Sequence, residues 1–179
     1  MIHRYHMAFF VALCHLNVFA QEQNEAEFER DLLVSFVTTT ALLPSSQSDV
    51  YVFVPSYGID LAYQLTPKWE MGLFSDIELL NYTVQTNDNL TIERAYPVIL
   101  SFVGIYKPFE KWAFIIGPGY EFETNKNFYI GRVGIEYELA VTRPDWLISF
   151  GITYENKELE YHVWEFGWTI GKLFSINDQ

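Results

Sequence analysis

Strict alternation of bulky apolar residues with small or polar ones is the feature that most limits how this chain can fold. From Trp146 to Tyr154 every second side chain is large and apolar, whereas the residues between them include Ser149, Gly151 and Thr153. A period of two places the two sets on opposite faces of a β-strand. The segment is therefore predicted to be a strand with one strongly apolar face.

The same alternation recurs in eight segments that are separated by turn-forming residues. Eight is the smallest usual number of strands in a bacterial membrane barrel. Each segment is longer than the roughly 9–11 residues that a tilted strand needs to cross the hydrocarbon layer. The predicted strands span residues 31–42, 50–65, 69–83, 95–107, 111–123, 127–141, 145–156 and 160–174.

A few positions depart from the simple pattern. Both faces of the fourth segment are apolar, but Ser101 and Lys107 lie on the same face. That face is therefore expected to point into the barrel, and the opposite face outward. Three apolar residues fall on the otherwise polar face of their strands and are expected to pack inside the barrel: Phe74, Ile115 and Ile130.

The two faces of the predicted sheet differ in a way that decides which one is enclosed. Trp164, Phe166 and Trp168 alternate with Glu165 and Gly167 in the last segment, and the other segments are similar. The bulky set would overfill the interior of a small barrel, which disfavours a soluble calycin-like barrel with the apolar face inside. The predicted fold is an all-β, eight-stranded antiparallel up-and-down transmembrane β-barrel, preceded by a cleavable signal peptide.

The beginning of the chain has the pattern of a secretory leader. The apolar run Met7–Leu13 follows a flank that contains Arg4, and it is too short to span a bilayer. Ala20 precedes an abruptly polar segment, and the single Cys14 lies inside the leader, so we expect a mature chain without thiols. The predicted organisation is a signal peptide at 1–20, a short polar segment at 21–30 and an outer-membrane β-barrel at 31–176.

Composition excludes one broad class of function. The formal net charge is −12, which is the wrong sign for a protein that binds nucleic acid. No binding to nucleic acid is therefore expected. The acidic residues are expected to lie in the loops and in the polar interior.

Three short turns are each followed by a tryptophan that begins the next predicted strand. The turns are centred on residues 66–68, 109–111 and 142–145. With the N-terminus in the periplasm, all three fall on the same side of the membrane. Trp69, Trp112 and Trp146 are therefore predicted to form an interfacial aromatic belt.

On this pattern, the chain resembles the small outer-membrane β-barrels of Gram-negative bacteria, in particular the OmpX and OmpA transmembrane-barrel group. The resemblance covers about residues 29–176, and we expect a Bacteroidetes-type branch. Near the end of the chain, the spacing of four residues is similar to the signal read by the barrel-assembly machinery. The four are Thr169, Gly171, Phe174 and Ile176, and Asn177–Gln179 follow them. The resemblance implies an outer-membrane location, a monomer, contact with outer-membrane lipid and lipopolysaccharide, and insertion by the assembly machinery.

The predicted interior contains one arginine among several acids. If the short turns set the register, Arg132 lies level with Glu155 and near Glu121, which predicts a charge network of these three residues. Glu136 and Glu165 are expected to lie close together without a cation partner unless Lys107 or water reaches them. One of them could then be protonated, the pair could hold a cation, or both could be solvated near an opening.

Candidates for catalysis are few. His162 is the one histidine outside the leader, and it is expected at the outer end of the last strand on the lipid side. We therefore expect a structural or surface-contact role, with no catalysis, cofactor or metal. The alternatives are a lipid-modifying hydrolase or acyltransferase at the outer leaflet, based on His162, and a narrow conduit for small solutes. The longest outer connection, residues 85–94, is expected to be a loop suited to partner contact.

Overall fold

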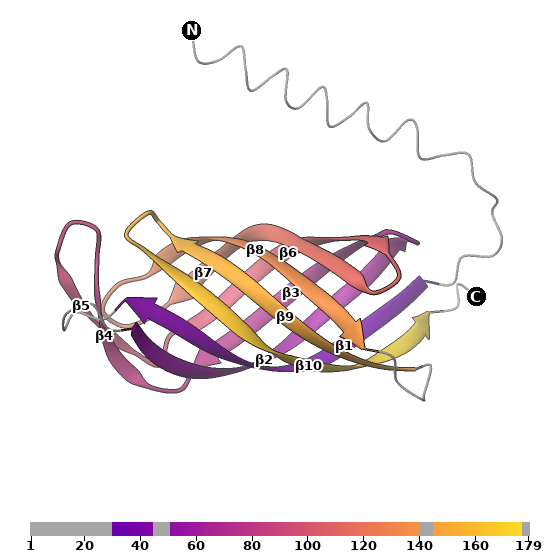
Figure 1. Ribbon diagram of the computed structural model, residues 1–179, viewed down its shortest axis with the longest axis horizontal. Helices are drawn as coiled ribbons and strands as arrows, with labels where there is room; N and C mark the ends of the chain where they lie inside the picture. Colours follow the sequence, from indigo (N-terminus) through magenta and orange to yellow (C-terminus); the bar gives the residue numbers. More distant parts are fainter. Residues whose placement is uncertain (1–29, 45–50, 140–144, 177–179) are drawn as a thin grey trace, which may run out of the picture.

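Eight long strands close into an antiparallel barrel, and two short strands form a separate hairpin at one end (Figure 1). The computed structural model describes residues 30–44, 51–139 and 145–176. The barrel predicted from the sequence is confirmed, whereas the predicted signal peptide, most of the polar segment after it and the turn at 142–144 lie outside the described residues. The barrel strands are β1 (Arg30–Pro44), β2 (Tyr51–Thr66), β3 (Trp69–Glu78), β6 (Val98–Phe109), β7 (Trp112–Phe122), β8 (Phe128–Leu139), β9 (Trp146–Lys157) and β10 (Tyr161–Ile176).

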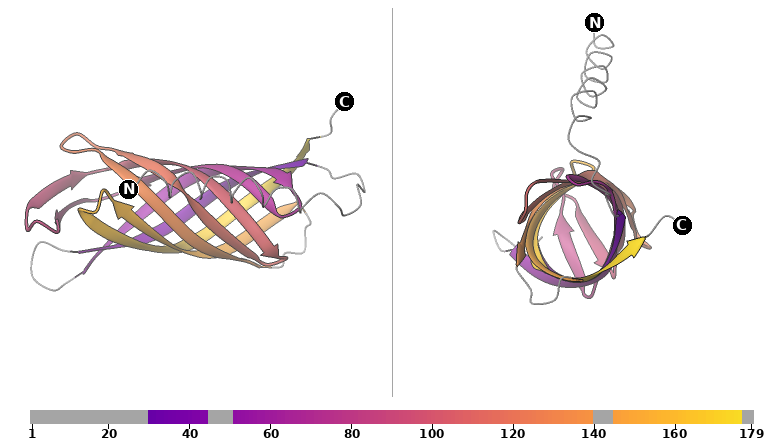
Figure 2. Two further views of the ribbon diagram at one scale, coloured as in Figure 1. Left: turned by 90° about the horizontal axis from the view of Figure 1, so that it is seen from above. Right: turned by 90° about the vertical axis from the view of Figure 1, so that its right-hand side faces the viewer.

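The ring of strands is complete. The strand order is β1-β10-β9-β8-β7-β6-β3-β2, and β1 and β10 pair without a break from Arg30↔Ile176 to Leu42↔Trp164. The view along the barrel shows this closed ring (Figure 2). Closure leaves no barrel strand with an unpaired edge, which a structure in lipid requires.

The side chains alternate across the wall as predicted. In β6, Phe102 and Tyr106 are exposed while Ser101 and Val103 are buried, so the predicted orientation of the ambiguous strand is correct. The three apolar residues expected inside are also buried there: Phe74, Ile115 and Ile130.

The outer surface of the barrel is a band of large apolar side chains. It includes Phe53, Phe114 and Trp168, which are all among the exposed residues. Water-soluble proteins rarely expose contiguous apolar patches of this kind, whereas the band is typical of the lipid-facing surface of a membrane barrel. Among the described residues, no helix is long and apolar enough to cross a bilayer.

The segment between β3 and β6 differs from the prediction. The predicted strands 69–83 and 95–107 are each interrupted, and the expected loop at 85–94 is largely the short hairpin formed by β4 (Asn81–Gln85) and β5 (Thr91–Ala95). The chain leaves the barrel wall at Leu79 and Leu80 and rejoins it at Tyr96 and Pro97, where Tyr96 has a φ of 49°. This hairpin lies at the end of the barrel opposite the start of β1 and the end of β10 (Figure 1).

Candidate functional site: the outer mouth and the charged lumen

The hairpin of residues 81–95, called the lid below, extends across the outer mouth. It emerges between β3 and β6, which lie three or four places from β9 and β10 in the closed ring. Its tip nevertheless contacts the β9–β10 turn: the backbone N–H of Asn87 donates to the carbonyl of Glu160 at 2.7 Å, and the side-chain amide of Asn87 donates to the carbonyl of Leu159. The lid therefore reaches from one side of the mouth to the opposite wall.

The inner face of the lid completes an apolar cluster. Tyr82 and Val84 alternate on β4 and are both buried. Full burial of one aliphatic side chain such as Val84 contributes about 1.5–3 kcal/mol, so this cluster stabilises the closed position. The barrel residues in the cluster are Ala41, Leu43, Val54, Phe128, Tyr161 and Val163.

The lid also brings a fully buried cation into the mouth. The guanidinium of Arg94 donates to Glu121, and its Nη1 lies 3.1 Å from Glu123 Oε2. The same Nη1 donates to the carbonyl of Lys126, and the guanidinium carbon lies 4.8 Å from the centre of the Phe128 ring. A charge buried this deeply requires partners, because an unpaired ion loses its solvation without compensation. These contacts therefore fix the lid to the barrel.

A second buried cation lies directly below the lid. Lys157 Nζ is 3.2 Å from Glu78 and 3.8 Å from Glu155, and it also donates to Glu121. The hydroxyl of Tyr82 donates to Glu78, so the lid and this lysine share one carboxylate. Burial, reinforced by the nearby charge of Glu78, raises the pKa of Tyr82 well above its ordinary value. The phenol is thus held in its neutral, donating form.

The predicted arginine network is present in part. Arg132 Nε donates to Glu155 at 2.7 Å, and the two residues are level in the β8–β9 register, as predicted. The second partner is Asp76, at 2.7 Å from Nη2, and the prediction of Glu121 in this role is wrong. The β7–β8 register places Gly117 level with Arg132, so Glu121 lies four residues farther out, roughly 13 Å along the strand.

Glu136 and Glu165 both line a small internal cavity, together with Arg132. Glu136 accepts a hydrogen bond from Ser149 at 2.9 Å, whereas no partner is found for Glu165 Oε1 among the described residues. Lys107 does not reach either acid. No cluster of His, Cys, Asp and Glu among the residues that the structure describes is arranged to hold a metal ion.

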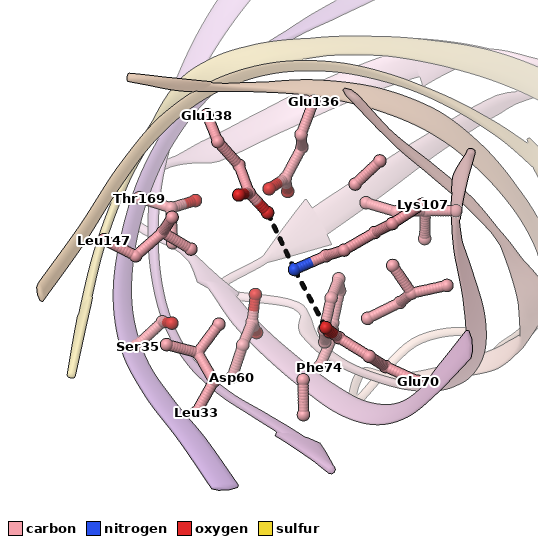
Figure 3. Close-up of a pocket in the computed structure, with 14 residues that line it drawn as sticks. Leu33, Ser35, Asp60, Glu70, Phe74, Lys107, Glu136, Glu138, Leu147 and Thr169 are labelled. Carbon is pink, nitrogen blue, oxygen red and sulfur yellow. Dashed lines mark ion pairs between the residues drawn. The ribbon is translucent and has the colours of Figure 1, made fainter. Parts of the chain in front are cut away.

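Lys107 instead lies at the end of the lumen where β1 begins and β10 ends. Its Nζ lies between Glu70, at 2.8 Å, and Glu138, at 2.7 Å (Figure 3). These side chains line a cavity into which Asp60 and Glu136 also point. The lumen thus has three charged levels: Arg94 and Lys157 at the outer mouth, Arg132 in the middle and Lys107 at the other end.

The remaining predicted residues lie on the wall. Trp69, Trp112 and Trp146 begin β3, β7 and β9, and all three side chains are exposed. Trp69 packs against Tyr106 and Trp112 against Tyr137 of the neighbouring strand, with ring centres 4.6 and 4.9 Å apart. His162 is exposed near the outer end of β10. In the proposed assembly signal, Thr169 and Gly171 face the lumen, while Phe174 and Ile176 are exposed.

The sequence alone did not identify Arg94 and Lys157 at the outer mouth, or Asp76 as a partner of Arg132. Lys157 had an available signal, because it follows Glu155 by two residues and so shares its inward face. Asp76 was on the inward face, but its level relative to Arg132 depends on strands across the lumen. Arg94 offered no comparable signal, since it lies in a segment that interrupts the alternation of the wall.

Comparison with known proteins supports the fold directly. No protein-family model and no curated protein matches this chain. Among solved structures, it is similar to Ail, the attachment invasion locus protein of Yersinia pestis in complex with the heparin analogue sucrose octasulfate, with a TM-score of 0.57 at 9% identity, covering 82% of this chain and 100% of Ail. The chain has the fold of the small outer-membrane β-barrels.

Two further structures agree. The N-terminal β-barrel domain of Pseudomonas aeruginosa OprF has a TM-score of 0.54 at 12% identity, covering 79% of this chain and 97% of that domain. Neisserial surface protein A has a TM-score of 0.50 at 12% identity, with 81% and 97% coverage. At these identities the similarity establishes the architecture alone.

Proposed function

We propose that this protein is an outer-membrane β-barrel whose lumen is closed to solutes, and that it acts through its structure and its outer surface without catalysis. The observation that carries the proposal is the lid, which spans the mouth and places the fully buried Arg94 against Glu121 and Glu123. A hairpin fixed by buried ion pairs favours a plug over an open pore.

The outer-membrane location is supported by the apolar band, the closed ring of strands and the similarity to outer-membrane barrels. The test is fractionation of the producing cells. The folded protein is expected in the outer-membrane fraction and to change its electrophoretic mobility on heating. Recovery in buffer without detergent would contradict the location. Membership of a Bacteroidetes-type branch stays a prediction that an alignment of homologues tests, and insertion by the barrel-assembly machinery is proposed from the C-terminal spacing.

The closed lumen is tested by conductance. Purified folded protein, added to planar bilayers beside an open porin as a positive control, is expected to give no stable conductance steps. Reproducible steps from the unaltered protein would overturn the proposal. A variant in which a short Gly-Ser turn replaces residues 81–95 separates the contribution of the lid from that of the Arg132 level below it.

The outer surface favours basic or neutral partners over polyanions. Asp88, Glu93 and Glu158 are exposed there, and Lys126 is paired with Glu160 at 2.9 Å. Ail was solved with a heparin analogue, but the charges on the described outer turns of this chain have the opposite sign to the one that sulfates require. Immobilised protein is expected to retain a cationic peptide at low salt and not to retain heparin, and retention of heparin would contradict this assignment.

The absence of catalysis is tested at His162. The lipid A of cells that produce the unaltered protein is expected to have the same mass spectrum as that of cells that produce His162→Ala. A modified species that disappears with the substitution would establish the lipid-modifying enzyme instead.

A further inference from the structure

An apolar groove runs along the lipid-facing wall of β8, β9 and β10 toward the outer end. Its floor and sides are formed by two rungs of cross-strand neighbours. One rung contains Ile135 and Ile152, and the next rung outward contains Val133, Tyr154 and Trp164. All five line the same depression. In a bilayer this groove has the shape and polarity to hold an acyl chain.

The next rung outward is polar. It contains Gly131, Asn156 and His162, which are cross-strand neighbours in the β8–β9 and β9–β10 registers. His162 Nδ1 lies 3.1 Å from the hydroxyl of Tyr154 and 3.4 Å from the side-chain nitrogen of Asn156. Both neighbours can donate to Nδ1, so the ring proton is assigned to Nε2. No residue that the structure describes accepts from that Nε2–H, which leaves it for a ligand.

Gly131 leaves open space at the other end of this polar rung. A Cβ placed on Gly131 would meet no heavy atom within 4 Å, unlike most glycines of the barrel, whose added Cβ would press on a neighbouring strand or side chain. The residue is exposed on the outer wall. A headgroup could therefore lie over Gly131 while it contacts the neighbouring side chains.

The chemistry of this level is uncharged and aromatic. The rings of Tyr154 and Trp164 are 5.0 Å apart, and Trp164 is half exposed. Glu158, in the turn beyond this level, accepts from the backbone N–H of Tyr129 at 3.1 Å, and Lys157 is turned into the lumen. A phosphate would call for Arg or Lys here, whereas neutral donors and acceptors beside an aromatic face suit sugar hydroxyls.

We propose that β8, β9 and β10 form a binding site for a glycolipid with an uncharged sugar headgroup. The acyl chain lies in the groove between Ile135 and Ile152. The sugar lies over Gly131, accepts from His162 Nε2–H and packs against Trp164. This site is on the outside of the barrel, so it stands whether or not the lumen conducts.

A second groove on the wall provides a control within the same molecule. It shares Ile135 with the first groove and extends from there toward the opposite end, where Phe109, Trp112, Phe114 and Tyr137 line it. Its polar neighbours are the charged Glu110 and Lys111 instead of a neutral rung. An amphiphile that binds only through its alkyl chain would fill both grooves alike.

The test is a nuclear magnetic resonance titration of the folded full barrel in micelles of lauryldimethylamine oxide. Dodecyl maltoside and dodecylphosphocholine, which have the same alkyl chain, are added separately. The maltoside is expected to shift the Gly131 amide and His162 ring signals saturably, and the phosphocholine is not. The Trp112 indole signal is expected to respond equally to both.

Two variants probe the two halves of the headgroup site. His162→Ala removes the donor, and Gly131→Leu fills the open space; both positions are exposed, and heat-modifiable mobility checks that each variant folds. Each substitution is expected to weaken the maltoside response about tenfold or more, followed at the amides of residues 133 and 152. Equal responses to both amphiphiles, or unchanged affinity in either folded variant, would overturn the proposal.

Discussion

The two ends of the lumen hold ion-pair triads of the same chemistry in different surroundings. At the outer end, Lys157 lies between Glu78 and Glu121, and all three side chains are fully buried. At the other end, Lys107 lies between Glu70 and Glu138, and its side chain is 22% exposed. The difference comes from the lid, which excludes water from one lysine, while side chains of the wall alone surround the other. Two similar ion-pair triads are therefore expected to differ several-fold in energetic importance.

The largest expected effect compares these two lysines. Lys157→Met leaves buried carboxylates without their cation and is expected to lower the free energy of unfolding by about 3–5 kcal/mol. Lys107→Met breaks a partly solvated triad and is expected to lower it by about 1 kcal/mol or less. Urea unfolding in lipid vesicles, followed by tryptophan fluorescence, measures both. Equal losses would show that the lid does not isolate the outer triad from water.

A smaller effect is expected when the lid alone loses its cation. In Arg94→Met, Glu121 keeps Lys157 as a partner. The free energy that favours the closed lid over the open lid is therefore expected to fall by about 1.5–3 kcal/mol, the value of a charge-assisted hydrogen bond. Faster hydrogen exchange is expected in the amides of 81–95, with the exchange of β1 and β10 unchanged. If the wall exchanged faster too, the lid and barrel would form one cooperative unit.

Alkaline pH is expected to loosen the lid through Tyr82. Because its pKa is raised in the folded state, the folded protein holds the phenol proton more tightly than the unfolded chain does. This stabilisation is complete below the ordinary tyrosine pKa of about 10 and is lost as pH rises through the higher folded value. Lid exchange measured from pH 8 upward should therefore show an alkaline component that Tyr82→Phe lacks. An identical profile in the variant would exclude Tyr82 as its source.

The smallest effect is expected at the tip. Asn87→Ala removes the side-chain hydrogen bond to Leu159 but keeps the backbone hydrogen bond to Glu160. The free energy that favours the closed lid is therefore expected to fall by about 0.5–1.5 kcal/mol. Limited proteolysis at residues 86–90 would detect it as faster cleavage in the folded protein. Asp88→Ala, also in the exposed tip, is the control, and similar cleavage of both variants would show that the contact with the opposite wall contributes little.

The barrel wall and the lid also differ in how far the sequence predicts their structure. Residues in the wall obey a period of two and a register set by short turns, so the amino-acid pattern alone places Arg132 level with Glu155. The lid could not be placed in this way. Its position depends on bends at Leu79–Leu80 and Tyr96–Pro97 and on a contact with the far wall, and local pattern does not encode such long-range contacts. Pro97 has no N–H to donate to a strand ladder, which was a local sign that a wall strand begins there.

The bond between the lid tip and the β9–β10 turn also bears on the order of assembly. The lid lies near the middle of the chain, whereas Lys157 and Glu160 are supplied later in the sequence. Asn87, which contacts Glu160, and Tyr82, which shares Glu78 with Lys157, can therefore dock in their final environment only after β9 and β10 are in place. Seating of this hairpin thus marks a finished barrel, and a truncated or stalled insertion intermediate would keep it open to protease from the outside.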